Sequence, residues 1–158
     1  MILTTAMLMG GGGDAAQDRG SRGNPGRPTA ITLSNVHPAG EFALDPQTVA
    51  AAPPVLALKV TKVVNPAETG FQLFVYLSYQ ATSGFQKILV GNVGFYPPDR
   101  PAGFLLRSSR AFAELKRSTT KPSDVRLSLE IKRLHESKPW TQVEITVAPP
   151  EWKSEPKE

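Results

Sequence analysis

The chain of 158 residues contains no cysteine and only two histidines, His37 and His135. The lack of cysteine excludes a disulfide framework, a thiolate metal site and a cysteine nucleophile. It does not indicate a compartment. The histidines do not form a His-x-x-x-His pair, no paired Asp spacing accompanies them, and no glycine loop follows a strand to bind phosphate. We therefore expect no metal site and no cofactor.

Signatures of catalysis are also scarce. The Gly-x-Ser-x-Gly turn of serine hydrolases is missing, and His135 lies in the polar turn HESKP, where a solvated side chain is the simpler interpretation. Glu130 and Glu144 fall on outward faces of two strands that could be neighbours, and two close carboxylates can serve glycoside hydrolysis. Their alternation with basic and polar residues favours ordinary cross-strand charge pairing instead. We predict that the protein is not an enzyme, with an unrecognised site on the fold as the alternative.

No apolar run approaches the roughly 20 residues that a transmembrane helix needs. The N-terminal stretch MILTTAMLM, residues 1–9, is apolar but short and has no basic segment before it. Two interpretations remain open: the end of a signal peptide that starts upstream, or a disordered start with chance hydrophobic residues. The first would make the protein secreted or periplasmic, which we favour over a cytoplasmic location.

Glycine and proline are frequent, with 13 and 15 residues, but unevenly spread. Residues 10–28 are rich in both and carry no large apolar side chain, so they cannot bury enough surface to offset the entropy of ordering. We predict a disordered tail over residues 1–40, a folded domain over 41–150 and a polar tail over 151–158. Trp152 is expected to pack back on the domain.

From residue 55 onward, apolar and polar residues alternate as in β-strands. Turns rich in Pro, Gly and Asn separate the segments that alternate, which are 55–64, 71–79, 85–96, 125–134 and 140–147. Segment 71–79 is apolar on both faces, which indicates a central strand covered on both sides. Gly91 and Gly94 suggest a bulge or a close approach of another segment. The pattern predicts an all-β antiparallel sandwich, Ig-like or jelly-roll-like.

At most one short helix is expected. Ser108 or Ser109 can cap a helix in which Phe112 and Leu115 point the same way. A strand through Phe104 and Leu106 is the competing interpretation.

The stretch GNVGFYPPDRPAGFLL, residues 91–106, interrupts the strand pattern with three prolines that cannot sit in a central strand. It predicts a rigid, wide connection between strands. Rigid exposed loops also lose little entropy on binding, so the same stretch can be a recognition tip. Its contact residues would be Tyr96, Asp99 and Arg100.

A basic run follows this loop, and the net charge of +4 comes from the part of the chain after residue 54. Such a patch is either a solvated face or a contact for nucleic acid or an acidic glycan. Glu114 is the only acid within it. Its basic residues are Arg107, Arg110, Lys116, Arg117 and Lys121.

The order of these pieces resembles the C-terminal β-sandwich of the tyrosinase and polyphenol oxidase family of type-3 copper proteins. The matching stretches are FQLFVYLS at 71–78, ILVGNVGFYP at 88–97, GFLLRSSRAFAEL at 103–115 and VEITVAPP at 143–150. The histidine helices that bind copper in that family are absent, so oxidase activity does not carry over. The resemblance implies a non-catalytic module that covers or supports a partner.

The sequence therefore predicts a non-catalytic β-sandwich that acts as an accessory or protein-binding module, with no integral membrane segment. The alternative is binding of an anionic polymer, nucleic acid or acidic glycan, through the basic run.

Overall fold

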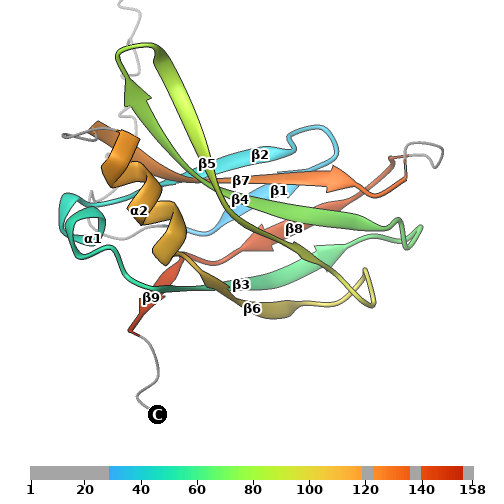
Figure 1. Cartoon of the computed structure of the whole chain (residues 1–158). Coiled ribbons are helices and arrows are strands. Elements are labelled where there is room, and N and C mark those ends of the chain that lie inside the picture. Colours follow the sequence, from blue (N-terminus) through green and yellow to red (C-terminus); the bar gives the residue numbers. More distant parts are fainter. Residues whose placement is uncertain (1–28, 119–122, 136–139, 155–158) are drawn as a thin grey trace, which may run out of the picture.

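The computed structural model describes residues 29–118, 123–135 and 140–154, which form two antiparallel sheets packed face to face (Figure 1). Sheet A contains, in order, β1 (Ile31–Ser34), β8 (Glu144–Val147), β3 (Val55–Val64) and β6 (Ala102–Arg107), and β9 (Glu151–Lys153) also pairs with β3. Sheet B contains, in order, β2 (Ala39–Ala43), β7 (Ser123–Arg133), β4 (Phe71–Ala81) and β5 (Gly84–Gly94). The predicted antiparallel β-sandwich is confirmed.

This strand order is that of an eight-stranded jelly roll, with β9 as an addition. The chain changes sheets from β2 to β3 through α1 (Pro46–Ala51) and from β6 to β7 through α2 (Ser109–Ser118). It also changes sheets at four loops, from β1 to β2, from β3 to β4, from β5 to β6 and from β7 to β8. All four loops lie at one end of the sandwich, on the right in Figure 1, which we call the loop end. Its described residues are 35–38, 65–70, 95–101, 134–135 and 140–143. The two helices lie at the opposite end, which we call the helix end.

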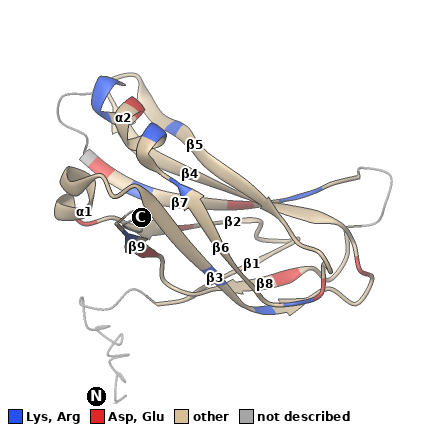
Figure 2. Cartoon of the chain, turned by 60° about the horizontal axis from the view of Figure 1, so that its bottom comes forward, with Lys and Arg blue, Asp and Glu red and all other residues tan. Residues whose placement is uncertain are grey.

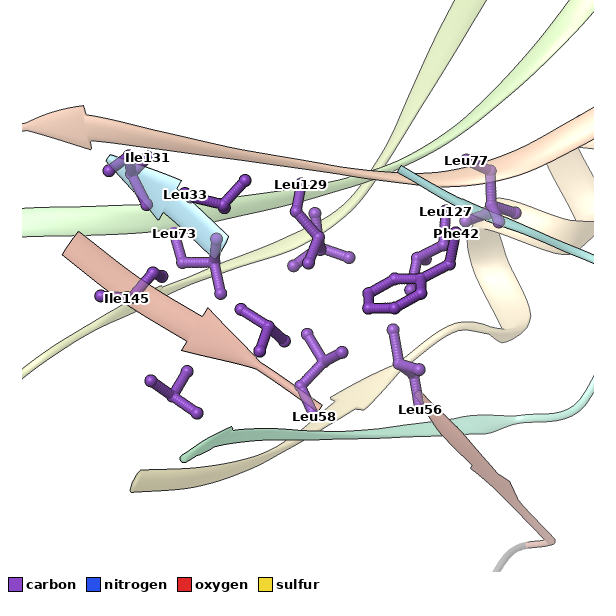
Figure 3. Close-up of a cluster of buried hydrophobic side chains, with 14 of the residues drawn as sticks. Leu33, Phe42, Leu56, Leu58, Leu73, Leu77, Leu127, Leu129, Ile131 and Ile145 are labelled. Carbon is purple, nitrogen blue, oxygen red and sulfur yellow. The ribbon is translucent and has the colours of Figure 1, made fainter. Parts of the chain in front are cut away.

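The core lies between the two sheets and consists of the inward-facing residues of their strands (Figure 3). Alternation places Leu56 and Leu58 of β3 opposite Leu127 and Leu129 of β7, and all four are almost completely buried. Burying a side chain of this size stabilises the fold by about 1.5–3 kcal/mol. The apolar positions of the alternating segments are therefore the residues that face this core.

The segment after the proline-rich loop contains both the strand and the helix that the sequence offered as alternatives, and the strand comes first. Phe104 and Leu106 belong to β6, and α2 (Ser109–Ser118) follows with Phe112 and Leu115 buried. Ser108 joins the two elements: its hydroxyl donates to the carbonyl of Pro53 at 2.6 Å and its backbone N–H donates to Pro54. This fixes where α2 leaves the sheet.

A second helix, α1 (Pro46–Ala51), was not predicted. Asp45 caps it by accepting a hydrogen bond from the backbone N–H of Thr48 at 2.8 Å, and Pro46 occupies the first turn. Asp followed by Pro is a recognisable start signal. The helix is short and buries none of its residues, so it has no apolar periodicity to reveal it.

The predicted tails need correction at both ends of the domain. β1 and the start of β2 fall within the predicted tail 1–40, so the strands begin at Ile31. The predicted polar tail 151–158 begins with β9, and Trp152 packs against Phe112 with ring centroids 5.5 Å apart, as expected for this residue. The predicted tail over residues 1–28 lies outside the described residues.

The predicted cover on both sides of β4 is wrong. β4 does lie between β7 and β5, but its outer residues Phe74 and Tyr76 are only partly buried, because within the described residues no further layer packs on them. The predicted bulge is present, since the β4–β5 register shifts between Val75 and Tyr76. Gly91 lies at this point, and a Cβ there would come within 3.2 Å of Leu106. A side chain at this position would therefore require the Leu106 side chain to shift by a few tenths of an ångström where β5 approaches β6.

Candidate functional site

The proline-rich loop is the connection that carries the chain from β5 in sheet B to β6 in sheet A. Phe95 at its start is buried and stacks on Phe71 with centroids 4.7 Å apart, while Phe104 meets it edge-on at 5.1 Å. The next residue, Tyr96, is 99% exposed and is followed by a cis peptide bond to Pro97. A core anchor thus directly precedes a fully exposed tyrosine.

Asn65 ties this loop to the neighbouring loop between β3 and β4. Its side-chain N–H groups donate to the carbonyl of Thr69 at 2.9 Å and to the carbonyl of Pro98 at 3.0 Å. Its side-chain oxygen accepts from the backbone N–H of Thr69 at 3.0 Å. Asn65 is 4% exposed, so these hydrogen bonds are shielded from competing water. The two loops are therefore held together as one braced surface.

Asp99 and Arg100, the other predicted contact residues of this loop, are both exposed. Asp99 lines a shallow hollow of about 330 Å³ together with Glu68 and Asn65. Neither Asp99 nor Arg100 forms an ion pair with another described residue. Their charges are thus available to a partner.

Exposed apolar side chains gather at the loop end. Of the seven exposed large hydrophobic residues in the described chain, four lie here: Val36, Val64, Tyr96 and Leu134. Leu134 is held by a hydrogen bond from its backbone N–H to the carbonyl of Gly70. The four residues are spread across this end, because the β1–β2 and β5–β6 loops join opposite edges of the two sheets. Exposed apolar side chains with polar neighbours are a feature of interaction sites. The sequence did not single out Val36, Val64 or Leu134, because a lone apolar residue in a turn carries no periodic signal.

The predicted basic residues lie at the other end of the molecule. Arg107 ends β6, and Arg110, Lys116 and Arg117 are exposed on α2, where Figure 2 shows the blue segments. β6 separates them from Tyr96 by its six residues, or about 20 Å of extended strand. The proline-rich loop and the basic run follow one another in the sequence, but the fold places them at opposite ends of the molecule. Lys121 lies outside the described residues.

The remaining candidate residues are scattered. Glu130 lies on β7 in sheet B and Glu144 on β8 in sheet A, so the two carboxylates are not on neighbouring strands. Glu144 instead pairs across strands with Lys62 at 3.1 Å. His37 and His135 are both exposed at the loop end. Among the described residues there is no group of three or more His, Cys, Asp or Glu that could hold a metal ion.

Within the described part of the chain, no helix has the length and apolar character to cross a membrane. No family profile, curated protein or solved structure matches the chain.

Proposed function

We propose that the protein is a non-catalytic accessory module that binds a protein partner through its loop end, with Tyr96 as the principal contact. The observation that carries the proposal is the full exposure of Tyr96 on a loop that Phe95 and Asn65 hold in place. A tyrosine at 99% exposure contributes almost nothing to the core. Tyrosine is among the residues that most often dominate binding energy at interfaces.

The bracing of the loop matters for affinity. Ordering a loop and its side chains on binding costs free energy, and a surface that is already fixed avoids most of this cost. Asn65 joins the two loops, and the exposed residues Val36, Val64 and Leu134 lie at the same end of the sandwich as Tyr96. Asp99 and Arg100 supply charges for the polar rim that interfaces generally have.

The resemblance to the C-terminal sandwich of the tyrosinase family supports the same proposal. It implies a module without copper ligands that covers or supports a partner. The stretch ILVGNVGFYP, which carries part of the likeness, ends at Pro97 within the loop proposed to bind. The stretch that resembles the tyrosinase family therefore includes the exposed residue Tyr96.

A second candidate function is binding of an anionic polymer at the helix end. Arg107, Arg110, Lys116 and Arg117 are exposed and take part in no ion pair with another described residue, so their charges are free to meet phosphate or carboxylate groups. Lys116 and Arg117 also lie in the last turn of α2, where the helix dipole favours cations without any ligand. That structural role makes this the weaker candidate.

A quantitative pull-down from native extract with the immobilised full chain tests the proposal. We compare the natural protein with Tyr96→Ala and with Leu105→Ala, a matched control that removes an exposed apolar side chain from the outer face of sheet A. One protein retained at a fixed ratio after a high-salt wash is expected for the natural chain and the control. Tyr96→Ala should weaken its binding at least tenfold.

Two results would count against the loop end. Equal retention by Tyr96→Ala and the natural protein would remove Tyr96 from the interface. Nucleic acid or acidic glycan that elutes as salt rises, and that is lost after Arg110, Lys116 and Arg117 are changed to Glu, would move the function to α2.

A further inference from the structure

The outer face of sheet B carries a cluster of half-exposed aromatic and apolar side chains that the proposed partner site does not use. Phe74 and Tyr76 of β4 lie at its centre, with their rings nearly parallel at 13° and centroids 6.3 Å apart. Leu89 of β5 is paired with Tyr76 and is 52% exposed. Within the described chain, no helix or strand packs over these residues. They cannot be explained as part of the core.

The ammonium groups of two lysines lie over the two rings. The ammonium group of Lys132 lies 4.9 Å from the centroid of Phe74, and that of Lys87 lies 5.5 Å from the centroid of Tyr76. Lys132 comes from β7 and Lys87 from β5, so one donor stands on each side of the aromatic strip. Gln72 and Asn92 extend it, with the Asn92 side chain donating to Gln72 at 3.3 Å. The strip thus has an apolar centre and a rim of hydrogen-bonding groups.

Carboxylates balance the positive charge of this face. Arg126 donates to Glu41 at 2.9 Å and to Asp124 at 2.8 Å, and Lys132 lies 3.4 Å from Glu130. The hydrogen bond from Arg126 is the main reason that the pKa of Glu41 is lowered, and the charge of Glu130 is the main reason that the pKa of Lys132 is raised. Glu41 and Lys132 therefore stay charged, and paired, around neutral pH.

The pairing decides between possible ligands. Three cations, Lys87, Arg126 and Lys132, are matched by three anions, Glu41, Asp124 and Glu130, so the face offers no net attraction to a polyanion. Single-stranded nucleic acid would require a positive groove beside the aromatic residues. A ligand for this face should be uncharged, with flat apolar surfaces and many hydroxyl groups at its edge.

We propose that the outer face of sheet B binds a neutral polysaccharide. The C–H face of a sugar ring takes the place of the lysine ammonium groups over Phe74 and Tyr76, because the negative face of an aromatic ring attracts weakly positive hydrogens. Lys87, Gln72 and Asn92 exchange hydrogen bonds with the hydroxyl groups, since they offer both donors and an acceptor. The site is an open sheet face rather than a pocket, so it suits a chain that lies across it rather than a single enclosed sugar.

This site is independent of the proposed partner site at the loop end. Electrophoresis of the full chain in native gels that contain hydroxyethylcellulose, laminarin, xylan or galactomannan tests it, with a plain gel as reference. We expect at least one of these polymers to retard the natural protein, and the retardation to persist when salt is added. Poly(U) serves for comparison, because it is a single-stranded RNA with a negatively charged backbone and bases that can stack on aromatic side chains.

The diagnostic variant carries Phe74→Ile and Tyr76→Ile, which keep apolar bulk and strand propensity but remove both rings. Its affinity should fall at least tenfold, while Tyr96→Ala, which alters the loop end, should bind as the natural protein does. Lys87→Ala is a second variant for the case in which the double variant does not fold, because Lys87 is exposed on an edge strand. We expect a severalfold loss from it.

Three outcomes would overturn the proposal. The first is that none of the four polysaccharides retards the protein. The second is that a folded double variant, or Lys87→Ala where the double variant is unfolded, binds as tightly as the natural chain. The third is that poly(U) alone binds and is released by salt, which would assign the face to nucleic acid.

Discussion

At the scale of single residues, Asn65 shows how much a braced loop depends on one side chain. Its amide serves two carbonyls and one backbone N–H from two loops, and it is almost completely buried. Tyr96, by contrast, contributes nothing to this bracing and is fully exposed. Stability and proposed recognition are thus divided between different residues of the same loop end.

Asn65→Ala should therefore lower the free energy of unfolding by about 2–3 kcal/mol, because it leaves buried backbone groups of Thr69 and Pro98 without partners. Urea denaturation measures the change. Asn92→Ala, which removes an exposed amide bonded only to Gln72, is the control and should cost less than about 0.5 kcal/mol. Equal losses in the two variants would show that the Asn65 hydrogen bonds do not hold the loops.

At the loop end, the sequence identified candidate contact residues only in a segment of unusual composition. Three prolines around Tyr96 indicated an exposed, rigid connection, and the structure places Tyr96 on such a connection. Tyr76 was assigned to a strand covered on both faces, because the sequence of an apolar outer residue in a sheet is the same whether a further protein layer or solvent lies over it. Asn65 was not singled out, since its partners lie in a loop 33 residues away.

At the scale of elements, the long strands and the short β8 are visible in the sequence, whereas the short strands β1, β2 and β9 are not. β3 begins and ends where alternation predicted, at Val55 and Val64, because ten alternating residues give a clear period. β1 and β9 have four and three residues and lie in the segments that were predicted as tails. What defines β9 is its partner: Trp152 lies opposite Leu56 and against Phe112 of α2.

Removal of residues 151–158 should consequently lower the free energy of unfolding by about 2–4 kcal/mol, through loss of the partly buried Trp152 and of the backbone pairing with β3. Thermal and urea unfolding of the shortened chain provide the measurement. A chain that lacks only residues 155–158 keeps β9 and should match the natural protein. If both deletions were harmless, 151–158 would be the mere polar tail that the sequence predicted.

At the scale of the whole molecule, alternation and turns predicted the sandwich but not which strands share a sheet. Glu130 and Glu144 appeared to be possible neighbours, yet their strands belong to different sheets. Sheet membership follows from long-range pairing, such as Ile31 with Val147, which local patterns do not encode. The separation of Tyr96 from the basic residues of α2 was hidden for the same reason.

Such distant pairings must form before the sheets can close, so we expect slow folding. After dilution from urea, the main refolding phase should fall between milliseconds and seconds, the range of domains dominated by non-local strand contacts. Stopped-flow tryptophan fluorescence of Trp140 and Trp152 can follow it. A main phase in microseconds would mean that local contacts dominate folding and would contradict this expectation.

The two ends of the sandwich differ in what they carry, and this difference has a practical consequence. β1 starts and β9 ends at the helix end, whereas the connection from β5 to β6 that carries Tyr96 lies at the loop end. A dye, biotin or surface linkage attached just before β1 or just after β9 is therefore remote from Tyr96 and leaves it facing the surrounding medium. Sequence changes in the loops likewise leave both attachment points untouched. The molecule can serve as an oriented display scaffold whose variable surface points away from its support.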